Sequence, residues 1–337
     1  MKDIEWSKLT FSYTETDVMI RSSYRNGAWG DLVATPDKTI NIHAAAAGLQ
    51  YAQQCFEGLK VYRRVDGTIG IFRPDMNARR MQSSAEAMYM PPVPVDMFLQ
   101  AMEMAVKYNI DYLPPYGTGA TLYIRPIMFG TSPRVGVSSA DEFEFCVIVT
   151  PIGPYFPVGF GTTPFVINRH VDRAAPFGTG QYKVGGNYAS SLRATEPAHE
   201  QGLGVLFLDS AEHKYLDECG GANIFLVKNG VYCTPKSDSI LPSIINRSLM
   251  TLCGDMGIKV EERRIAVTEL GDFQEAASCG TGAAISPIST ITDPDNGVVY
   301  NYGIEPGPVC VKLFTTLRDI QFGRTEDIHG WCHLIDC

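Results

Sequence analysis

Lys183 lies among glycines, in a segment that could present its amine to a bound molecule. Residues 178–188 read GTGQYKVGGNY, with glycines at positions 178, 180, 185 and 186. Glycine lets the backbone bend sharply or approach a ligand closely. A lysine that loses water around its amine gives up its proton more readily and becomes a nucleophile. The segment also fits an ordinary turn with an exposed lysine, and composition alone leaves both interpretations open.

Three further side chains could serve as charged partners of a ligand. Glu218 lies just before the apolar run IFLV, and a carboxylate at a strand entrance can point into a cleft. Arg79 and Arg80 follow the strand-like IFRP in a predicted helix, where either guanidinium could hold a phosphate by a forked contact. A solvated turn glutamate and a solvated helix face explain the same patterns without a ligand.

Two segments could present backbone N–H groups to an anion. Residues 240–246, ILPSIIN, are predicted to begin a helix, whose first N–H groups and positive dipole end suit a phosphate. Residues 278–286, SCGTGAAIS, are predicted to form a turn of small residues whose amides could receive a carboxylate. Most helix starts and tight turns bind nothing, so a purely structural interpretation stays open for both.

Charge and composition restrict the partners of the chain. The net charge is −9, from 28 basic and 37 acidic residues, which disfavours nucleic acid and anionic membranes as partners. The uncharged stretch 145–168 is interrupted by prolines and predicts a buried strand running into a loop rather than a membrane span. The nine cysteines form no C-x-x-C pair and the first residues contain no apolar signal core. These features predict reduced thiols, no metal site and a cytoplasmic location.

The candidate residues need a large mixed scaffold to position them. Asp66-Gly67 and Asn229-Gly230 each predict a hairpin, and the second is the best type I′ turn signal in the chain. Helices are predicted over 75–89, from Asp96 as an N-cap, from Ser243 with Gly257 as C-cap, and from Pro308. Strands are predicted over 59–65, 68–72, 121–128, 143–150, 205–208, 223–228 and 231–234.

Strands grouped in hairpins, with helices between them, indicate an α+β (mixed α/β) fold with two domains. The length of 337 residues agrees with two domains. We expect a smaller N-terminal α/β domain over 1–152, a Pro/Gly-rich connection over 153–164, and a larger C-terminal domain over 165–337.

The candidate segments occur together, and in this order, in a known family. The chain closely resembles the branched-chain amino acid aminotransferases, which are fold-type IV, class IV pyridoxal-phosphate enzymes related in fold to D-amino acid aminotransferase. The most specific matches are QQCFEGLKVY (53–62), FRPDMNARRM (72–81), LYIRP (122–126), GPYFP (153–157), KVGGNYA (183–189), DECGGANIF (217–225), ILPSIINRSL (240–249), GTGAAISPIS (280–289) and DIQFGR (319–324).

The resemblance implies a pyridoxal 5'-phosphate site in the C-terminal domain. Lys183 matches the Schiff-base lysine that also moves protons during the reaction. Glu218 matches the carboxylate that pairs with the pyridine nitrogen, and Tyr188 the tyrosine that hydrogen-bonds the ring hydroxyl oxygen. The residues implied for the phosphate are Arg80 rather than Arg79, the amides of Ile244 and Ile245, and the hydroxyl of Thr281.

The same resemblance implies how substrates bind. The amides of Thr281 and Gly282 match a turn that receives the substrate carboxylate. An apolar pocket for leucine, isoleucine or valine would be formed by Phe11, Phe56, Tyr123 and Tyr155.

A second set of residues would complete the pocket. Arg125, with the hydroxyls of Tyr51 and Tyr123, is the candidate for the side-chain carboxylate of glutamate. Tyr51, Val135 and Val137 match residues that the partner subunit of a homodimer contributes.

The expected activity is a ping-pong transfer of the amino group from a branched-chain L-amino acid to 2-oxoglutarate. D-amino acid aminotransferase and aminodeoxychorismate lyase activity, on the same fold, are the alternatives, although FEGLK and LYIRP fit the branched-chain group better. A catalytically silent cofactor-binding or scaffold protein is the alternative from another class.

The sequence departs from the family pattern in three respects. Gly221 stands where many eukaryotic relatives have threonine, and Gly282 where alanine is common. Ala283 and Ser286 occupy the places of a redox-active cysteine pair found in some mammalian members, so no thiol switch is expected there.

Overall fold

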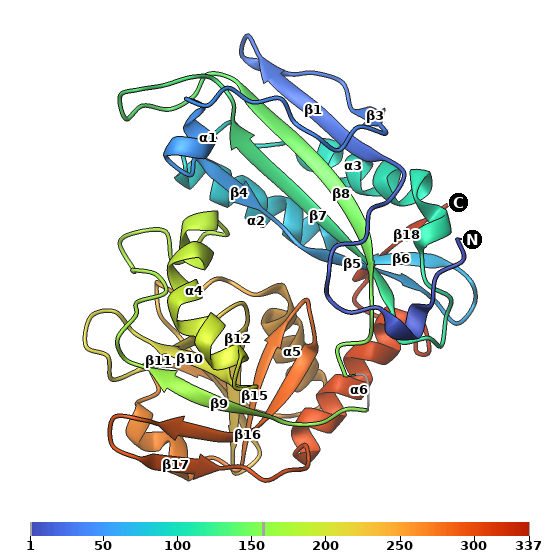
Figure 1. The fold of residues 1–337 in the computed structure, drawn as a ribbon. Coiled ribbons are helices and arrows are strands. Elements are labelled where there is room, and N and C mark those ends of the chain that lie inside the picture. Colours follow the sequence, from blue (N-terminus) through green and yellow to red (C-terminus); the bar gives the residue numbers. More distant parts are fainter. Residues whose placement is uncertain (1, 157–158, 337) are drawn as a thin grey trace. The chain divides into compact units, whose positions relative to one another are not determined.

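The computed structural model describes residues 2–156 and 159–336 (Figure 1). The chain divides into two compact units: Met1–Pro157 with Tyr182–Gly185 and Asp319–Cys337, and Val158–Gln181 with Gly186–Arg318. Two segments that we expected in the C-terminal domain, 182–185 and 319–337, therefore group with the first unit. Residues 157 and 158, inside the predicted connection, lie outside the described residues.

The first unit is built on a nine-stranded sheet in the order β18-β6-β5-β7-β8-β1-β2, with β3 paired to β1 and β4 to β7. Its strands are β1 (Met19–Arg25), β2 (Ala28–Trp29), β3 (Val33–Thr35), β4 (Gln54–Phe56), β5 (Leu59–Arg63), β6 (Ile69–Phe72), β7 (Thr121–Gly130), β8 (Phe143–Ile152) and β18 (Cys332–Ile335). Its helices are α1 (Ala47–Gln50), α2 (Pro74–Ala87) and α3 (Val95–Tyr108), with short 3₁₀ turns at Trp6–Lys8 and Ile110–Tyr112.

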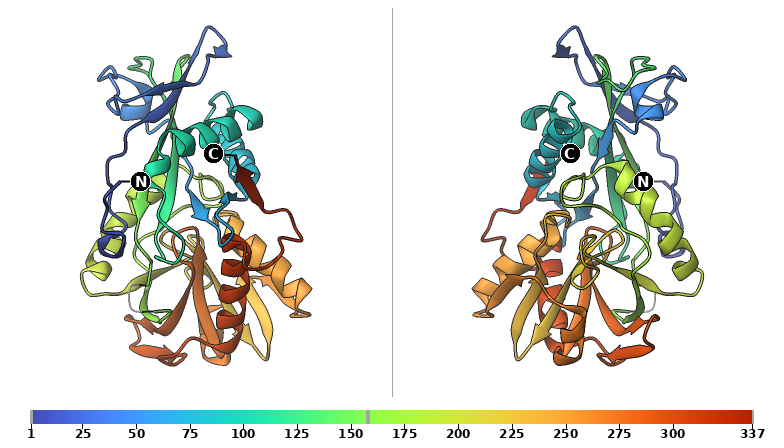
Figure 2. Two further views of the ribbon diagram at one scale, coloured as in Figure 1. Left: turned by 90° about the vertical axis from the view of Figure 1, so that its right-hand side faces the viewer. Right: turned by 90° about the vertical axis from the view of Figure 1, so that its left-hand side faces the viewer.

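Alternation along β7 separates the core of the first unit from its candidate site residues. Leu122, Ile124 and Met128 point into the core that also contains the apolar faces of α2 and α3. Figure 2 shows these two helices together on one side of the sheet. Because successive side chains of a strand point to opposite faces, Tyr123 and Arg125 lie on the other face.

The second unit contains another nine-stranded sheet, in the order β11-β10-β9-β16-β15-β12-β13-β14, with β17 paired to β16. Its strands are β9 (Thr163–Asn168), β10 (Gly204–Leu208), β11 (Leu216–Cys219), β12 (Asn223–Lys228), β13 (Val231–Pro235), β14 (Val260–Arg263), β15 (Glu275–Gly280), β16 (Ala284–Asp293) and β17 (Val298–Asn301). The helices of this half of the chain are α4 (Gly185–His199), α5 (Ile244–Asp255) and α6 (Pro308–Phe322), with a 3₁₀ segment at Val267–Asp272.

Both faces of β10 are buried, which explains its uninterrupted apolar sequence. Leu206 and Leu208 join the main core of the second unit. Val205 and Phe207 point the other way, into a smaller cluster with Ala194 and other residues of α4. A strand that is covered on both sides loses the alternation of polar and apolar residues.

The predicted elements are confirmed with one correction. Asn229 and Gly230 have φ of 52° and 75°, as a type I′ turn requires, and the Ser243 side chain accepts a hydrogen bond from the backbone N–H of Asn246 at the start of α5. Asp96 does not cap α3. The extended backbone ends at Pro94, so the helix already begins at Val95 and Asp96 lies in its first turn.

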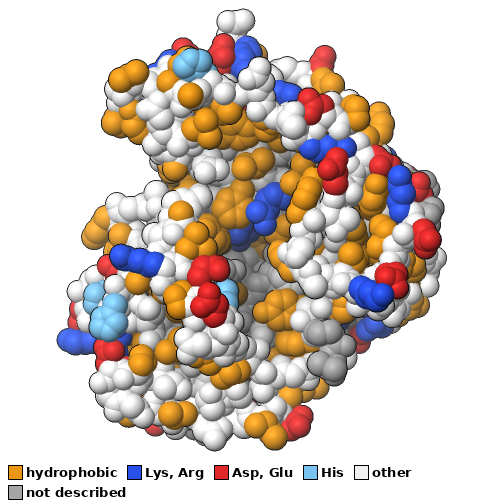
Figure 3. Space-filling model, in the orientation of Figure 1, with side chains coloured by type: hydrophobic (Ala, Val, Ile, Leu, Met, Phe, Trp, Pro, Cys, Tyr) orange, Lys and Arg blue, Asp and Glu red, His pale blue; other side chains and the backbone are white. Residues whose placement is uncertain are grey.

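The distribution of surface charge and the length of the helices bear on nucleic acid and membranes as possible partners. On the face that Figure 3 shows, Lys and Arg side chains are interspersed with Asp and Glu rather than gathered into one basic surface. Every helix within residues 2–156 and 159–336 is too short or too polar to cross a bilayer.

Candidate active site

The backbone around Lys183 is fixed by two elements of the first unit. The N–H of Lys183 donates to the Ser84 hydroxyl of α2 at 2.9 Å, and the Lys183 carbonyl accepts from the N–H of Phe56 in β4 at 3.1 Å. The Lys183 ammonium lies over the Phe56 ring, 4.9 Å from its centroid. The lysine is therefore half-buried and positioned by the fold rather than carried on a free turn, which excludes the simple interpretation of an exposed turn residue.

Arg80 is held by a buried carboxylate, Glu57, which the sequence analysis did not single out. Arg80 donates from Nε to Glu57 Oε1 at 2.7 Å and from Nη2 to Oε2 at 2.8 Å, and Asn77 donates to Oε2 at 2.7 Å. Burial of Glu57 disfavours its charge, but the charges of Arg80 and Lys183 outweigh burial and hold the pKa of this carboxyl below its usual value. Glu57 thus fixes the direction of the Arg80 guanidinium.

Phe11, Phe56, Tyr123 and Arg125 form a group that we call the aromatic wall. The Phe11 and Tyr123 rings meet edge to face at 5.2 Å, and the Arg125 guanidinium lies over the Phe56 and Tyr123 rings at 4.9 and 5.3 Å. Arg125 Nη2 also donates to the Tyr123 hydroxyl at 3.2 Å. Gly58 makes room for that hydroxyl, because a Cβ at this position would overlap it. Phe56 and Tyr123 therefore meet around the Arg125 guanidinium, and Phe11 joins them through Tyr123.

The remaining predicted substrate residues of the first unit, Tyr51, Val135, Val137 and Tyr155, are not part of the aromatic wall. The Tyr51 hydroxyl donates to the carbonyl of Val135, and the side chains of Val135 and Val137 are 87% and 89% exposed. Tyr155 is half-exposed and packs edge to face on Phe156. Tyr51 and Val135, predicted to come from a partner subunit, thus contact each other within one chain.

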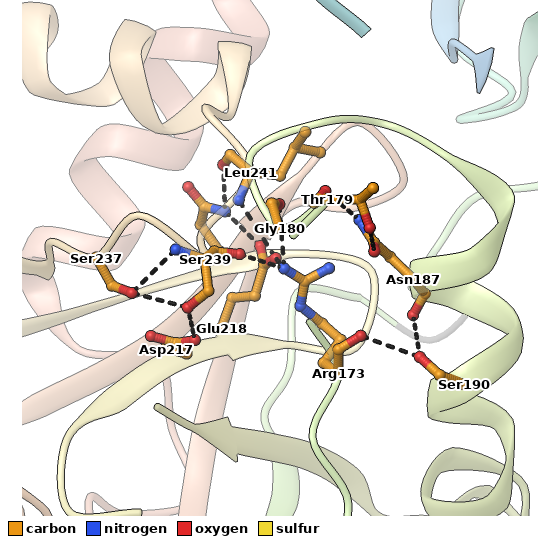
Figure 4. A network of polar contacts seen from close by, with 11 residues as sticks. Arg173, Thr179, Gly180, Asn187, Ser190, Asp217, Glu218, Ser237, Ser239 and Leu241 are labelled. Atoms are coloured by element: carbon orange, nitrogen blue, oxygen red, sulfur yellow. Dashed lines mark hydrogen bonds and ion pairs between the residues drawn. The ribbon is translucent and has the colours of Figure 1, made fainter. Parts of the chain in front are cut away.

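Glu218 is the centre of a buried polar network in the second unit (Figure 4). Its Oε1 lies 2.5 Å from Nη2 of Arg173 and 3.4 Å from the N–H of Leu241, which donates to it, and its Oε2 accepts from Asn223 at 2.8 Å. Burial raises the pKa of Glu218 to about 7, against the opposing effect of the Arg173 charge. A carboxyl with this pKa can hold or release a proton near neutral pH.

Arg173 was not predicted, and the loops around it position it. Its Nη2 donates to the carbonyls of Ser239 at 2.5 Å and Gly180 at 3.4 Å. A Cβ on Gly180 would lie 2.5 Å from the Ser239 Cα, so only glycine permits this approach of the two loops. Arg173 stands in an unremarkable NRHVDRAAP segment, and only the folded chain reveals its partner.

The other predicted cofactor residues of the second unit are Ile244, Ile245, Thr281 and Tyr188. They lie on α5, on the turn between β15 and β16, and on α4. Asn223 donates to both Glu218 and the Leu241 carbonyl, which joins Glu218 to the segment that leads into α5. Ile244 and Ile245 open this helix, where the first N–H groups have no acceptor within the helix. Thr281 and Gly282 form the turn between β15 and β16, whose first strand pairs with β12. Tyr188 lies in the first turn of α4, half-buried.

The comparisons with known proteins show the family and the fold. The family model for class IV amino-transferases matches residues 54–291. A branched-chain-amino-acid aminotransferase of Haemophilus influenzae is 43% identical over 98% of both chains. The crystal structure of the Escherichia coli branched-chain amino acid aminotransferase, 26% identical, superposes with a TM-score of 0.78 over 96% of this chain and 100% of that one. The pyridoxal-phosphate form of the Thermobaculum terrenum enzyme, 24% identical with a TM-score of 0.80, covers 96% of this chain and 99% of its own.

Further solved branched-chain amino acid aminotransferases with this fold hold pyridoxamine 5'-phosphate, N-(5'-phosphopyridoxyl)-L-glutamate or 4-methylvaleric acid. The fold and the family match therefore define a class IV, pyridoxal-phosphate-dependent aminotransferase. Within that class, the chain belongs to the branched-chain-amino-acid aminotransferase family.

The residues present fit pyridoxal 5'-phosphate. The group needs an amine for its aldehyde, an acid beside its ring nitrogen and N–H donors for its phosphate. The first unit supplies a fixed, half-buried lysine and an arginine oriented by Glu57. The second supplies a buried carboxyl of raised pKa that is joined by Asn223 to the start of a capped helix.

Proposed function

We propose that the chain transfers the amino group of L-leucine, L-isoleucine or L-valine to 2-oxoglutarate by a ping-pong reaction, giving branched-chain 2-oxo acids and L-glutamate. The observation that carries the proposal is the fixing of Lys183 between α2 and β4, beside the aromatic wall, in a chain of this family. Pyridoxal 5'-phosphate, when bound, supplies the carbonyl for amine exchange and the electron sink for the substrate carbanion.

Lys183 is the proposed catalytic residue. Its Nζ binds the cofactor and later takes the proton from the substrate Cα. Glu218 would pair with the ring nitrogen of the cofactor and, as a carboxylate, hold the proton on that nitrogen. Tyr188 donates to the ring hydroxyl oxygen. The phosphate is bound by Arg80, the amides of Ile244 and Ile245, and the Thr281 hydroxyl.

The substrate binds through an apolar and a polar set of contacts. Thr281 and Gly282 receive the α-carboxylate through their amides. The branched side chain packs on Phe11, Phe56, Tyr123 and Tyr155, which exclude water from the reacting carbon.

The glutamate side chain needs a cation in this otherwise apolar pocket. Arg125 supplies it, because its guanidinium is held against two rings and its buried Nε has no hydrogen-bond partner among the described residues. The hydroxyls of Tyr51 and Tyr123 assist.

We propose that the enzyme is a homodimer in which Tyr51, Val135 and Val137 complete the pocket of the partner subunit. The high exposure of both valines supports this assignment, since an interface would cover them. Analytical ultracentrifugation tests the dimer.

The proposed location is the cytoplasm, where the free thiols of the described cysteines stay reduced, and cell fractionation tests this location.

The direct test is Lys183→Ala. The variant should lose the visible absorbance of lysine-bound cofactor and the half-reaction with L-leucine, whereas Lys228→Ala, at an exposed lysine paired with Asp272, should keep both. Wild-type turnover by Lys183→Ala would refute the assignment. Separate incubations with L-leucine, D-alanine and aminodeoxychorismate distinguish the proposed activity from the two alternatives on this fold.

A further inference from the structure

A cavity in the second unit, lined by none of the residues proposed to bind cofactor or substrate, contains an unusual buried acid. Its volume is about 360 Å³, and its walls are formed by 209–211, 215–217, 236–239, Pro176 and Arg264. We call it the Asp217 cavity. Asp217 and Glu218 are neighbours on β11, at the place where its register against β10 shifts. Asp217 belongs to the walls of the cavity, whereas Glu218 does not.

Asp217 has one carboxylate oxygen that no group of the described chain satisfies. The residue is only 4% exposed. Its Oδ2 accepts from the Ser239 hydroxyl, whereas its buried Oδ1 has no hydrogen-bond partner among the described residues. Figure 4 shows Ser239 between Asp217 and Arg173. A buried acceptor without a donor is costly, and a donor that enters the cavity would remove that cost. Burial also raises the pKa of the Asp217 carboxyl, against the opposing effect of the Ser239 and Ser237 hydroxyls.

The charges around the cavity indicate the kind of donor. No group of three or more His, Cys, Asp or Glu side chains within the described residues could hold a metal ion, which favours an organic ammonium. Arg264 is already engaged, by Glu212 at 2.7 Å and by the Tyr215 ring at 3.6 Å. Lys236 is exposed at the cavity, and no described residue forms an ion pair or hydrogen bond with its ammonium. Asp209 and Asp238 also line the cavity, and the Asp209 carboxylate already accepts from the backbone N–H groups of Glu212, Lys214 and Tyr215. Beside these, the cavity offers the buried carboxylate of Asp217 and the available cation of Lys236.

A molecule that carries an ammonium and a carboxylate could pair with both the Asp217 carboxylate and the Lys236 ammonium. Apolar surface from Pro176, Ala211 and Leu216 leaves room for a small uncharged side chain. We propose that the Asp217 cavity is a second, non-catalytic site for a small zwitterionic α-amino acid. The ligand ammonium donates to Asp217 Oδ1, and its carboxylate pairs with Lys236. The cavity lies within the 300–1,000 Å³ that is usual for small-molecule sites.

The test is the number of amino-acid sites on the holoenzyme. The probe is 2-aminoisobutyrate, which has no α-hydrogen and cannot be transaminated, titrated by isothermal calorimetry. We expect two equivalents per wild-type chain, one of them at the Asp217 cavity. Lys236→Ala, at an exposed side chain, should weaken that second equivalent at least tenfold. Lys259→Ala, at a lysine 71% exposed in another loop, is the matched control and should retain it.

Two results would overturn the proposal. One is a single equivalent on the wild-type enzyme, and the other is unchanged binding by Lys236→Ala. Asp217→Asn should also lose the second equivalent, and its unfolding curve shows whether the variant is folded. The site does not depend on the proposed reaction: Lys183→Ala should lose the active-site equivalent and keep the one at the Asp217 cavity.

Discussion

Glu57 positions the guanidinium of Arg80, the residue that we propose binds the cofactor phosphate. Glu57 is fully buried and accepts from Nε and Nη2 of Arg80. Fork-to-fork pairing of this kind is geometrically specific, so the direction of the guanidinium follows from the carboxylate.

We therefore expect Glu57→Gln to weaken cofactor binding through the phosphate. The amide cannot accept both guanidinium donors, and the Arg80 charge loses its buried partner, so the free energy of unfolding should fall by about 3 kcal/mol. The dissociation constant of pyridoxal 5'-phosphate should rise at least tenfold, while that of pyridoxal, which lacks the phosphate, should stay within twofold. Equal weakening of both compounds in a binding titration would contradict the positioning role.

Glu218 predicts a pH dependence of stability in the cofactor-free chain. Its pKa is raised from 4.5 to about 7, so between these values the folded chain holds a proton that the unfolded chain has released. The stabilisation is complete below pH 4.5 and is lost as the pH rises through 7, a change on the order of 3 kcal/mol.

Glu218→Gln should lack this change, because an amide does not titrate. Chemical unfolding of both apo proteins across this range measures the difference between them. If the two stabilities run parallel with pH, the raised pKa is wrong.

At the scale of elements, the stability of the second unit depends on the close approach of two loops at Gly180. Gly180→Ala should force the Ser239 segment to move, because the new Cβ would lie 2.5 Å from the Ser239 Cα, and should cost about 1–3 kcal/mol of unfolding free energy.

Gly254→Ala is the matched control, since a Cβ in that turn of α5 meets nothing within 4 Å. The control should be stabilised by up to about 1 kcal/mol through helix propensity. Thermal and denaturant unfolding measure both variants, and a neutral Gly180→Ala would show that the loops have freedom to separate.

Local elements were predictable from the sequence because their signals are local. The apolar spacing in α3 and the Asn229-Gly230 turn depend on neighbouring residues, and both are confirmed. The prediction that Asp96 caps α3 was wrong for a related reason. More than one residue near a helix start can precede its first turn, and here the extended backbone of Pro94 sets the start at Val95.

The pairs within the candidate site could not be predicted in the same way. Glu57 and Arg80 are 23 residues apart, and Arg173 and Glu218 meet only through long-range folding. A sequence motif can indicate that a charged residue is important, but the choice of its partner depends on the packing of whole elements. The unpartnered Asp217 oxygen is likewise a property of the folded chain.

At the scale of the whole molecule, the last strand contributes to the first sheet. β18 pairs with β6, and the Trp331 carbonyl accepts from the N–H of Arg73 while its ring packs on Phe72 at 5.8 Å. Trp331 is 8% exposed.

Truncation after Gly330 should therefore destabilise the first unit by about 3–5 kcal/mol, through loss of this buried indole and the strand. Truncation after Ile335 keeps both and should match the full chain. Denaturant titrations of the two truncated proteins check the difference, and similar midpoints would show that β18 adds little.

The pairing of β18 with β6 has a consequence for synthesis on the ribosome. Residues 69–72 leave the exit tunnel long before residues 332–335. The edge of β6 that pairs with β18 therefore stays unpaired for most of translation. The second unit, Val158–Gln181 with Gly186–Arg318, can close its own sheet earlier. The amino-terminal sheet is then completed last, and a chaperone that shields an unpaired strand edge would be needed most during that interval.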